Sequence, residues 1–281
     1  MTTPFHSSKQ IKTCAWLAAG ALSFLTWPAR ADVADSLRWM LPESVSSYGP
    51  SVDKLYYYLI MTTGTAFAIV VLAVLYMCVR YRHKDGQKAY YTHGNSWSST
   101  ALTLFLAMMV FTCIDMNVVR MSNAAAKETQ TYPDDATAIH IHVLAQQFNW
   151  RFQYAGPDGK FGKIDLKKDS TENFFGLDPK ADPDAKDDVT TEASFCVPVN
   201  TPVILEIRAK DVIHSFFLPN FRIKQDAVPG MKTQCWFQAT KVGDYDVACA
   251  QLCGMMHSQM HARLLVREQK EYEEWLKDHA P

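Results

Sequence analysis

The sequence lacks a strong excess of charge of either sign. Its 28 lysines and arginines stand against 29 aspartates and glutamates, for a formal net charge of −1 over 281 residues. A nucleic-acid-binding surface is therefore not indicated, and 48% hydrophobic residues argue against general disorder. The chain also has no internal repeat and no C-x-x-C-H motif, so a covalently attached haem is not expected in it.

The N-terminus has the features of a secretory signal peptide. Residues 1–31 combine a weakly basic start, an apolar run and the small-residue sequence ARA at residues 29–31. These features predict cleavage before Asp32 and export of the chain that follows. An uncleaved anchor helix is the alternative, although the apolar run is short for a membrane span.

Two longer apolar stretches predict a membrane hairpin. Residues 55–79 and 97–119 each exceed the roughly 20 residues that cross about 30 Å of hydrocarbon. The loop between them, residues 80–96, holds four basic residues and one acid, which predicts a cytoplasmic loop. Residues 32–54 and everything after residue 119 are then expected outside, in a multi-pass protein of the bacterial cytoplasmic membrane.

Beyond a polar linker, residues 120–135, the hydrophobic pattern changes to the period of two that is typical of β-strands. Segments rich in β-branched and aromatic residues alternate with Gly and Pro turns. They predict an all-β sandwich over residues 136–268, closed by a short amphipathic helix over residues 269–281. The expected fold is a two-helix transmembrane hairpin followed by this sandwich.

An acidic insertion interrupts the predicted sandwich. Its six acids are opposed by two lysines; the acids are Asp178, Asp182, Asp184, Asp187, Asp188 and Glu192. Two interpretations fit this composition. The insertion either attracts the basic face of a protein partner or is a solvated loop without a partner.

Soft metal ligands are concentrated near the end of the predicted sandwich. Cys249, Cys253, His257 and Met260 form the pattern C-x3-C-x3-H-x2-M, and His214 lies upstream in the apolar segment DVIHSFFLP. Two thiolates, imidazole and thioether form a donor set that suits copper and serves hard cations poorly. Two thiolates so close can bridge two copper ions, with one histidine on each. The alternatives are a disulfide between the two cysteines and a zinc site with two cysteines and two histidines.

Other candidate ligands give weaker signals. His140 and His142 share one face of a predicted strand, but no third donor accompanies them, so a polar outer face is expected. Cys196 and Cys235 lie in predicted strands, as either a disulfide or two buried thiols. The methionine pair at residues 255–256 is expected to pack around the metal site rather than to bind metal.

The segments CAQLCGMMHSQM and DVIHSFFLPNFRIKQDAVPGM, with the two spans before them, resemble subunit II of the haem–copper cytochrome c oxidases. The resemblance covers nearly the whole chain after the signal peptide. It implies a cupredoxin-like sandwich that holds the dinuclear copper A centre. The resemblance implies that Cys249 and Cys253 supply two bridging thiolates and that His214 and His257 are the terminal imidazoles. It also implies a weak axial thioether from Met260 and an axial backbone carbonyl from Gln251. Asp211 is expected to orient one of the histidines.

The resemblance also implies a role in respiration. A subunit of this kind accepts electrons from a c-type cytochrome and passes them to haem in subunit I, which reduces oxygen to water with proton translocation. The implied partners are therefore the haem-bearing subunit I, other oxidase subunits, a c-type cytochrome and the lipid bilayer. The alternatives are the copper A subunit of a nitric oxide reductase complex and a periplasmic copper-binding module.

Three positions depart from the family pattern. Gln251 stands where the family usually has a glutamate that helps bind magnesium at the interface with subunit I, and an amide oxygen is a weaker ligand for that ion. The family's Gln-Trp-Tyr-Trp is replaced by Gln-Phe-Asn-Trp, which places Phe148 and Trp150 where electrons usually arrive. The sequence HGNSWSSTALTLFL lacks the family's glutamate at the start of the second span, which leaves the proton route open.

Overall fold

The described part of the chain begins shortly before the first long helix. The computed structural model describes residues 41–281 apart from 89–90, 92, 135 and 171–172. The predicted signal peptide, residues 1–31, and residues 32–40 of the predicted outer segment lie outside the described residues.

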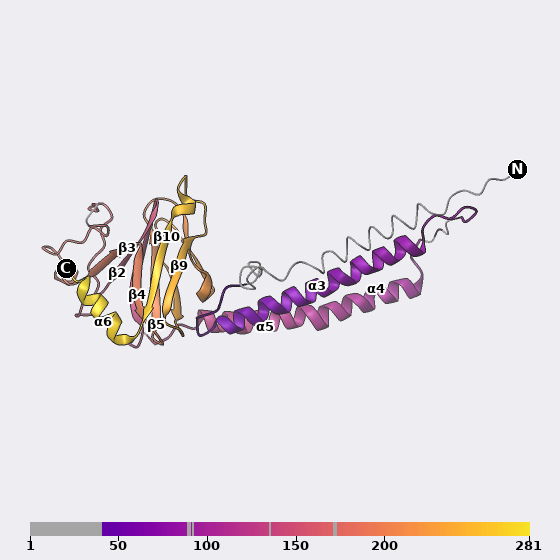
Figure 1. Cartoon of the computed structure of the whole chain (residues 1–281), viewed down its shortest axis with the longest axis horizontal. Helices are drawn as coiled ribbons and strands as arrows, with labels where there is room; N and C mark the ends of the chain where they lie inside the picture. Colours follow the sequence, from indigo (N-terminus) through magenta and orange to yellow (C-terminus); the bar gives the residue numbers. More distant parts are fainter. Residues whose placement is uncertain (1–40, 89–90, 92, 135, 171–172) are drawn as a thin grey trace, which may run out of the picture. The chain divides into compact units, whose positions relative to one another are not determined.

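Two long apolar helices form a hairpin in the first part of the described chain (Figure 1). Helix α3 spans Gly49–Arg80, and the second helix consists of α4 (Trp97–Val110), a π-helical turn (Phe111–Asp115) and α5 (Met116–Gln130). Their most apolar stretches reach mean hydropathies of 2.2 and 2.0 and are not buried within the chain. Such helices are long and apolar enough to cross a membrane. The predicted two-helix hairpin is confirmed.

Both helices extend beyond the stretches that hydropathy marked. The first helix starts at Gly49 instead of residue 55, and the second runs on to Gln130 through most of the predicted linker 120–135. The residues of that extension, MSNAAAKETQ, are polar but include strong helix formers such as Ala, Lys, Glu and Met. Hydropathy therefore marks the lipid-facing part of a helix, whereas helix propensity decides where the helix ends.

Two five-stranded sheets pack face to face in the rest of the described chain (Figure 1). The strands are β1 Ile139–Gln146, β2 Asn149–Tyr154, β3 Val189–Glu192, β4 Ser194–Pro198, β5 Pro202–Ala209, β6 His214–Leu218, β7 Ile223–Ala227, β8 Thr233–Gln238, β9 Gly243–Cys249 and β10 His261–Arg267. Their orders are β3-β2-β1-β5-β8 and β4-β10-β9-β6-β7. The helix α6, Gln269–Asp278, closes the chain. This arrangement confirms the predicted all-β, cupredoxin-like sandwich.

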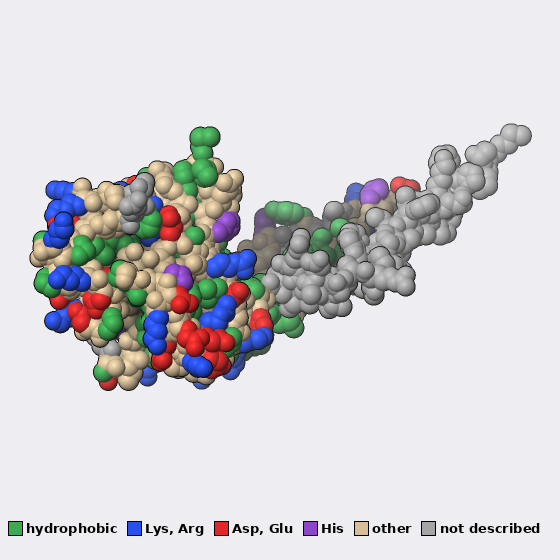
Figure 2. All heavy atoms as spheres, turned by 60° about the vertical axis from the view of Figure 1, so that its left-hand side comes forward, with side chains coloured by type: hydrophobic (Ala, Val, Ile, Leu, Met, Phe, Trp, Pro, Cys, Tyr) green, Lys and Arg blue, Asp and Glu red, His purple; other side chains and the backbone are tan. Residues whose placement is uncertain are grey.

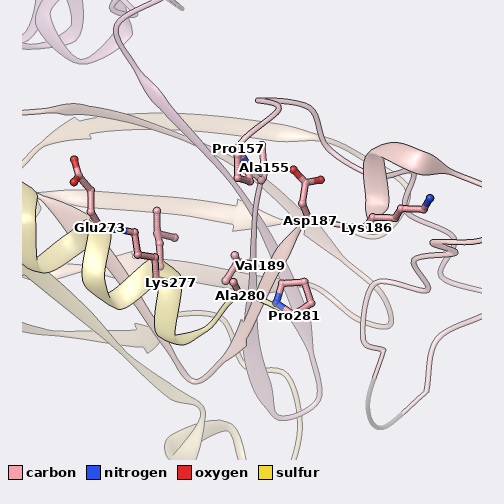
Figure 3. A pocket seen from close by; sticks show the side chains of 11 residues that line it. Ala155, Pro157, Lys186, Asp187, Val189, Glu273, Lys277, Ala280 and Pro281 are labelled. Carbon is pink, nitrogen blue, oxygen red and sulfur yellow. The ribbon is translucent and has the colours of Figure 1, made fainter.

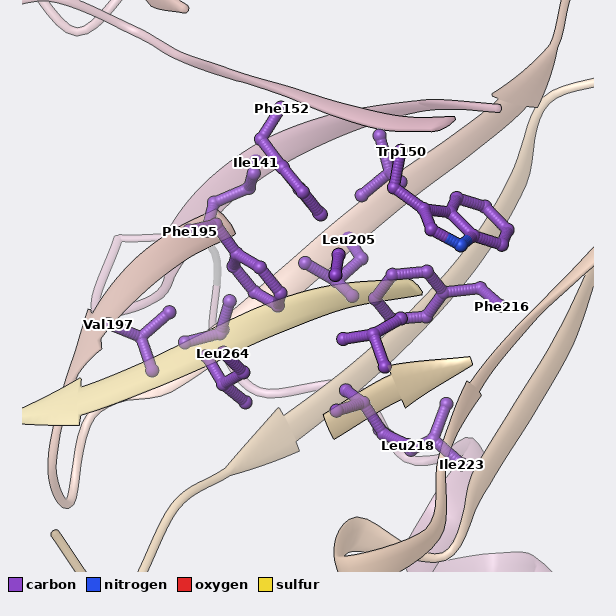
Figure 4. Close-up of a cluster of buried hydrophobic side chains, with 14 of the residues drawn as sticks. Ile141, Trp150, Phe152, Phe195, Val197, Leu205, Phe216, Leu218, Ile223 and Leu264 are labelled. Atoms are coloured by element: carbon purple, nitrogen blue, oxygen red, sulfur yellow. The ribbon is translucent and has the colours of Figure 1, made fainter. Parts of the chain in front are cut away.

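A layer of aromatic side chains fills the space between the sheets (Figure 4). Phe152 of β2 stacks on Phe195 of β4 with ring centroids 4.2 Å apart, and Phe216 of β6 meets Trp150 edge-on at 5.2 Å. All four side chains are fully buried. Burying each of them stabilises the fold by about 1.5–3 kcal/mol. This packing holds the end of the sandwich at which β6 begins and β9 ends.

Candidate metal centre

The end of β9 and the loop between β9 and β10 hold four of the predicted ligands. The Sγ atoms of Cys249 and Cys253 lie 3.9 Å apart, and the Sγ of Cys253 lies 3.5 Å from Nδ1 of His257. The Sδ of Met260, which is fully buried, lies 3.8 Å from the same sulfur. A short 3-10 helix, His257–Gln259, turns the chain back so that the histidine and methionine face the cysteines. The spacing C-x3-C-x3-H-x2-M therefore converges at one point.

The pairing of β6 with β9 brings the fifth ligand to the same place. Phe216 lies opposite Cys249 in the antiparallel ladder, and the N–H of Ala250 donates to the carbonyl of Ser215 at 2.9 Å. His214, the first residue of β6, is fully buried, and its Nδ1 lies 4.0 Å from the Sγ of Cys249. Among the described residues, His214 and the two cysteines are the one group of three His, Cys, Asp or Glu ligand atoms within 4.8 Å of one another.

Asp211 holds the imidazole of His214 in this orientation. Its Oδ1 lies 2.8 Å from Nε2 of His214, which leaves Nδ1 directed at the sulfur. Its two oxygens also accept hydrogen bonds from the N–H groups of Gln147 and Val212, each at 2.7 Å. Partial burial by itself raises the pKa of Asp211, but these hydrogen bonds outweigh it and keep the pKa below its usual value. The carboxylate is therefore ionised and can accept a hydrogen bond from Nε2–H of His214.

All six cysteines of the described residues are free thiols. The 3.9 Å between the sulfurs of Cys249 and Cys253 is nearly twice the length of about 2.05 Å that a disulfide requires. Cys196 and Cys235 lie in β4 and β8, which belong to different sheets. Burial raises the pKa of each of these two thiols to about 12, so both stay protonated and inert. Both predicted disulfide alternatives are wrong.

The backbone of the cysteine loop supplies a further donor. The carbonyl oxygen of Gln251 lies 3.2 Å from the Sγ of Cys249, while the rest of the residue is exposed. The expectation that Met255 and Met256 pack around the site is wrong, because they are 100% and 47% exposed. Gly254, with φ of +139°, turns the backbone so that the side chains after it project outward. Leu252 is also 77% exposed, so the surface of this loop is apolar.

The β1–β2 turn lies against this loop. Phe148 is half-buried, and a Cβ added to Gly254 would stand 2.9 Å from its ring. The Nε2 of Gln147 donates to the carbonyl of Cys253 at 2.6 Å. Trp150 is fully buried, with its ring edge-on to that of His214 at 6.1 Å between centroids. Of the two aromatic residues, only Phe148 reaches the surface beside the cysteines.

His142 of β1 belongs to a polar network on the outer face of its sheet. Nδ1 of His142 lies 3.0 Å from Oε1 of Gln153, and its ring stacks on Phe161 at 3.8 Å. Burial lowers the pKa of His142, which favours the neutral ring at pH 7. This is the polar outer face that the sequence predicted.

The acids of the insertion stabilise the insertion itself. Asp188 is 5% exposed and accepts hydrogen bonds from Nε2 of Gln153 at 2.6 Å and the N–H of Gly162 at 2.8 Å. Asp182 accepts from the N–H of Lys163 at 2.8 Å. Burial raises the pKa of Asp188 despite these bonds. The next residue, Val189, pairs with Tyr154, at the end of β2 remote from the β1–β2 turn. These contacts favour the interpretation as a loop without a partner.

A cavity of about 520 Å³ lies at that same end of β2 (Figure 3). The residues that line it come from the segment after β2, from the end of the insertion and from the C-terminus: Ala155, Gly156, Pro157, Lys186, Asp187, Val189, Glu273, Leu276, Lys277, Ala280 and Pro281. No cysteine, histidine or methionine lines it. It is therefore separate from the metal ligands. Figure 2 shows charged side chains over the lower part of the sandwich and hydrophobic ones projecting from its upper end.

Several known proteins share sequence with this chain. Residues 139–266 match the family described as "Cytochrome C oxidase subunit II, periplasmic domain". The chain is 36% identical over 219 residues to the "Alternative cytochrome c oxidase subunit 2" of Bradyrhizobium diazoefficiens, covering 76% of this chain and 75% of that protein. It is 29% identical over 266 residues to cytochrome c oxidase subunit 2 of Thermostichus vulcanus, covering 84% and 77%. The crystal structure of the periplasmic domain of subunit II of cytochrome oxidase of Bradyrhizobium japonicum is similar at a TM-score of 0.39 and 29% identity, covering 53% of this chain and 96% of that chain.

Proposed function

Because this chain belongs to the cytochrome c oxidase subunit II family, and is thus a membrane-anchored subunit of a haem–copper terminal oxidase, we propose that its sandwich holds the dinuclear copper A centre. The observation that carries this proposal is the convergence of two cysteine sulfurs, two imidazoles, a thioether and a carbonyl at one end of the sandwich. Zinc would not need the thioether, whereas copper is well served by soft sulfur donors together with imidazole.

The ligands that would hold copper come from the start of β6, from the end of β9 and from the loop that follows β9. Cys249 and Cys253 would bridge the two ions, and His214 and His257 would each bind one of them. Met260 and the carbonyl of Gln251 would be weak axial donors, as the resemblance to the family implies. When bound, the pair of coppers supplies a one-electron carrier. The protein contributes a rigid set of donors, because burial of the methionine and one histidine limits movement and excludes water.

We further propose that electrons arrive at this end of the sandwich from a c-type cytochrome outside the cytoplasm. Phe148 lies at the surface against the cysteine loop, so it is the aromatic residue that a docked donor can touch. The electrons continue to haem in subunit I, where oxygen is reduced. The side chain of Gln251 is exposed, and as an amide it would contribute only weakly to magnesium binding at the interface with subunit I.

The copper content of the purified full-length chain tests the proposal. We expect two copper ions per chain and, after partial oxidation, a spectrum in which one unpaired electron is shared equally by both nuclei. Met260→Leu should retain both ions and shift the reduction potential, because an axial thioether tunes a copper site more than it holds it. A spectrum of a single isolated copper, or one copper per chain, would contradict the dinuclear assignment.

Docking of the donor is expected to depend little on salt. Residues 249–262 contain no Lys, Arg, Asp or Glu, and Asp182 and Asp188 of the insertion accept hydrogen bonds from backbone N–H groups of the neighbouring segment. Changing Asp182, Asp184 and Asp187 together to Asn should therefore leave the association rate with a c-type cytochrome within about twofold of the parent rate. Stopped-flow measurements at about 0.01 M and 0.15 M ionic strength span Debye lengths of roughly 30 and 8 Å. A severalfold decrease in the association rate that occurs only at low salt would contradict this prediction and would show that the acidic insertion is a docking surface.

A further inference from the structure

We propose that Gln147 is a positioning residue that fastens the cysteine loop to the carboxylate orienting His214. The inference rests on the proposed copper site and concerns how this chain keeps the ligands of that site in register. The β1–β2 turn would then have two roles: Gln147 holds the cysteine loop in place, and Phe148 lies at the surface.

Gln147 bonds to both halves of the site at once. Its backbone N–H donates to Oδ2 of Asp211 at 2.7 Å, and its side-chain Nε2 donates to the carbonyl of Cys253 at 2.6 Å. Asp211 precedes β6 and contacts His214, whereas Cys253 lies in the loop between β9 and β10. One residue of a third segment therefore sets the distance between the imidazole and one of the sulfurs.

The close fit of the turn on the loop supports the same role. A Cβ at Gly254 would stand 2.9 Å from the ring of Phe148 and 3.0 Å from Nε2 of Gln147, so the backbone of the loop approaches the turn as closely as only glycine allows. Gly254 directly follows Cys253. The contact thus acts on the residue that carries the sulfur.

The cysteine loop needs such a contact because much of it is exposed. Leu252 is 77% exposed and Met255 100%, so neither anchors the loop in the core. By contrast, Cys253 is buried, with only 5% of the residue exposed. Losing the bond to its carbonyl would free the loop to shift, which would change the geometry that the two sulfurs offer to copper.

The test compares Gln147→Met with Gln146→Met in the full-length chain. Methionine is close in length to glutamine and cannot donate a hydrogen bond, while Gln146 is a matched control whose side chain accepts from Arg151 and not from the cysteine loop. We expect Gln147→Met to bind two coppers with an altered hyperfine pattern and reduction potential. It should also lose copper to a chelator about 10-fold faster or more, as is typical when a partner of a metal ligand is removed. Gln146→Met should match the parent in all three.

A second readout separates this inference from the copper assignment. In metal-free protein, thiol labelling of Cys253, located by peptide mapping, should be severalfold faster in Gln147→Met than in Gln146→Met. If the parent binds no copper, the proposed function fails and the labelling rates alone decide whether Gln147 fastens the loop. Faster labelling with an unchanged copper spectrum and potential would show a merely structural role and overturn the positioning claim. Equal labelling together with equal copper release would overturn it as well.

Discussion

We expect Cys249→Ser and Cys253→Ser each to abolish the dinuclear copper centre and electron transfer from the donor. The sulfurs lie 3.9 Å apart, and each faces a different histidine, at 4.0 and 3.5 Å. A serine hydroxyl remains protonated at neutral pH and is a hard ligand, so a single remaining thiolate cannot bridge two ions. Electron transfer should fall by more than about 100-fold, since even partners outside the ligand set typically cost 10- to 100-fold.

Copper analysis and electron paramagnetic resonance of the full-length variants provide the measurement. Cys78→Ser is the matched control, because Cys78 is an exposed thiol in α3. The substitution removes one sulfur and leaves the sandwich unchanged. The control should keep both coppers and the shared-electron spectrum. Retention of that spectrum in Cys249→Ser would mean that the metal is bound by another set of ligands.

The largest effect on stability is expected for Tyr154→Phe. The Tyr154 hydroxyl donates to the carbonyl of Cys196 and accepts from its N–H, both at 2.8 Å, and the side chain is 2% exposed. Removing the hydroxyl leaves two backbone groups without partners between the sheets. Each unsatisfied group costs about 1–3 kcal/mol, so the loss of two partners should lower the unfolding free energy of the sandwich by roughly 2–6 kcal/mol.

Denaturant unfolding of the full-length chain, followed by the β-sheet signal in circular dichroism, measures this loss. Tyr245→Phe is a suitable control, because the Tyr245 hydroxyl donates to the carbonyl of Lys241 at 3.0 Å in an exposed position. That change should cost no more than about 1 kcal/mol. Equal costs for the two variants would show that water reaches the backbone of β4, and that the hydroxyl is not needed between the sheets.

The metal ligands that lie close together in sequence were predictable as a group. Four of them fall between Cys249 and Met260, and a loop of that length leaves few ways to place soft donors apart. His214, 35 residues before Cys249, could be named as a candidate from its apolar segment, but the sequence shows no local sign of how it reaches the cysteines. Its approach to Cys249 depends on the pairing of Phe216 with that cysteine across β6 and β9, and pairing between distant strands leaves no local pattern.

Where the expectations failed, the cause was a long-range contact or its absence. Met255 and Met256 are apolar and adjacent to ligands, yet the turn at Gly254 projects them into solvent. The acids of the insertion suggested a docking surface, yet Asp188 is buried against Gln153, a residue far from it in sequence. Composition reports how polar a segment is, and it does not report which side chains the fold will bring to that segment.

By itself, the sequence determined the two apolar helices, the β-sandwich and the chemical nature of the metal ligands. Each of these follows from short-range properties: an apolar run long enough for a bilayer, a period of two, and sulfur and imidazole at loop spacing. The tertiary structure alone decided which imidazole meets which sulfur, that the six described cysteines stay free, and that Gln147 joins the two halves of the site. Those outcomes depend on strand register and on the packing of the β1–β2 turn, which arise only when segments distant in the chain are brought together.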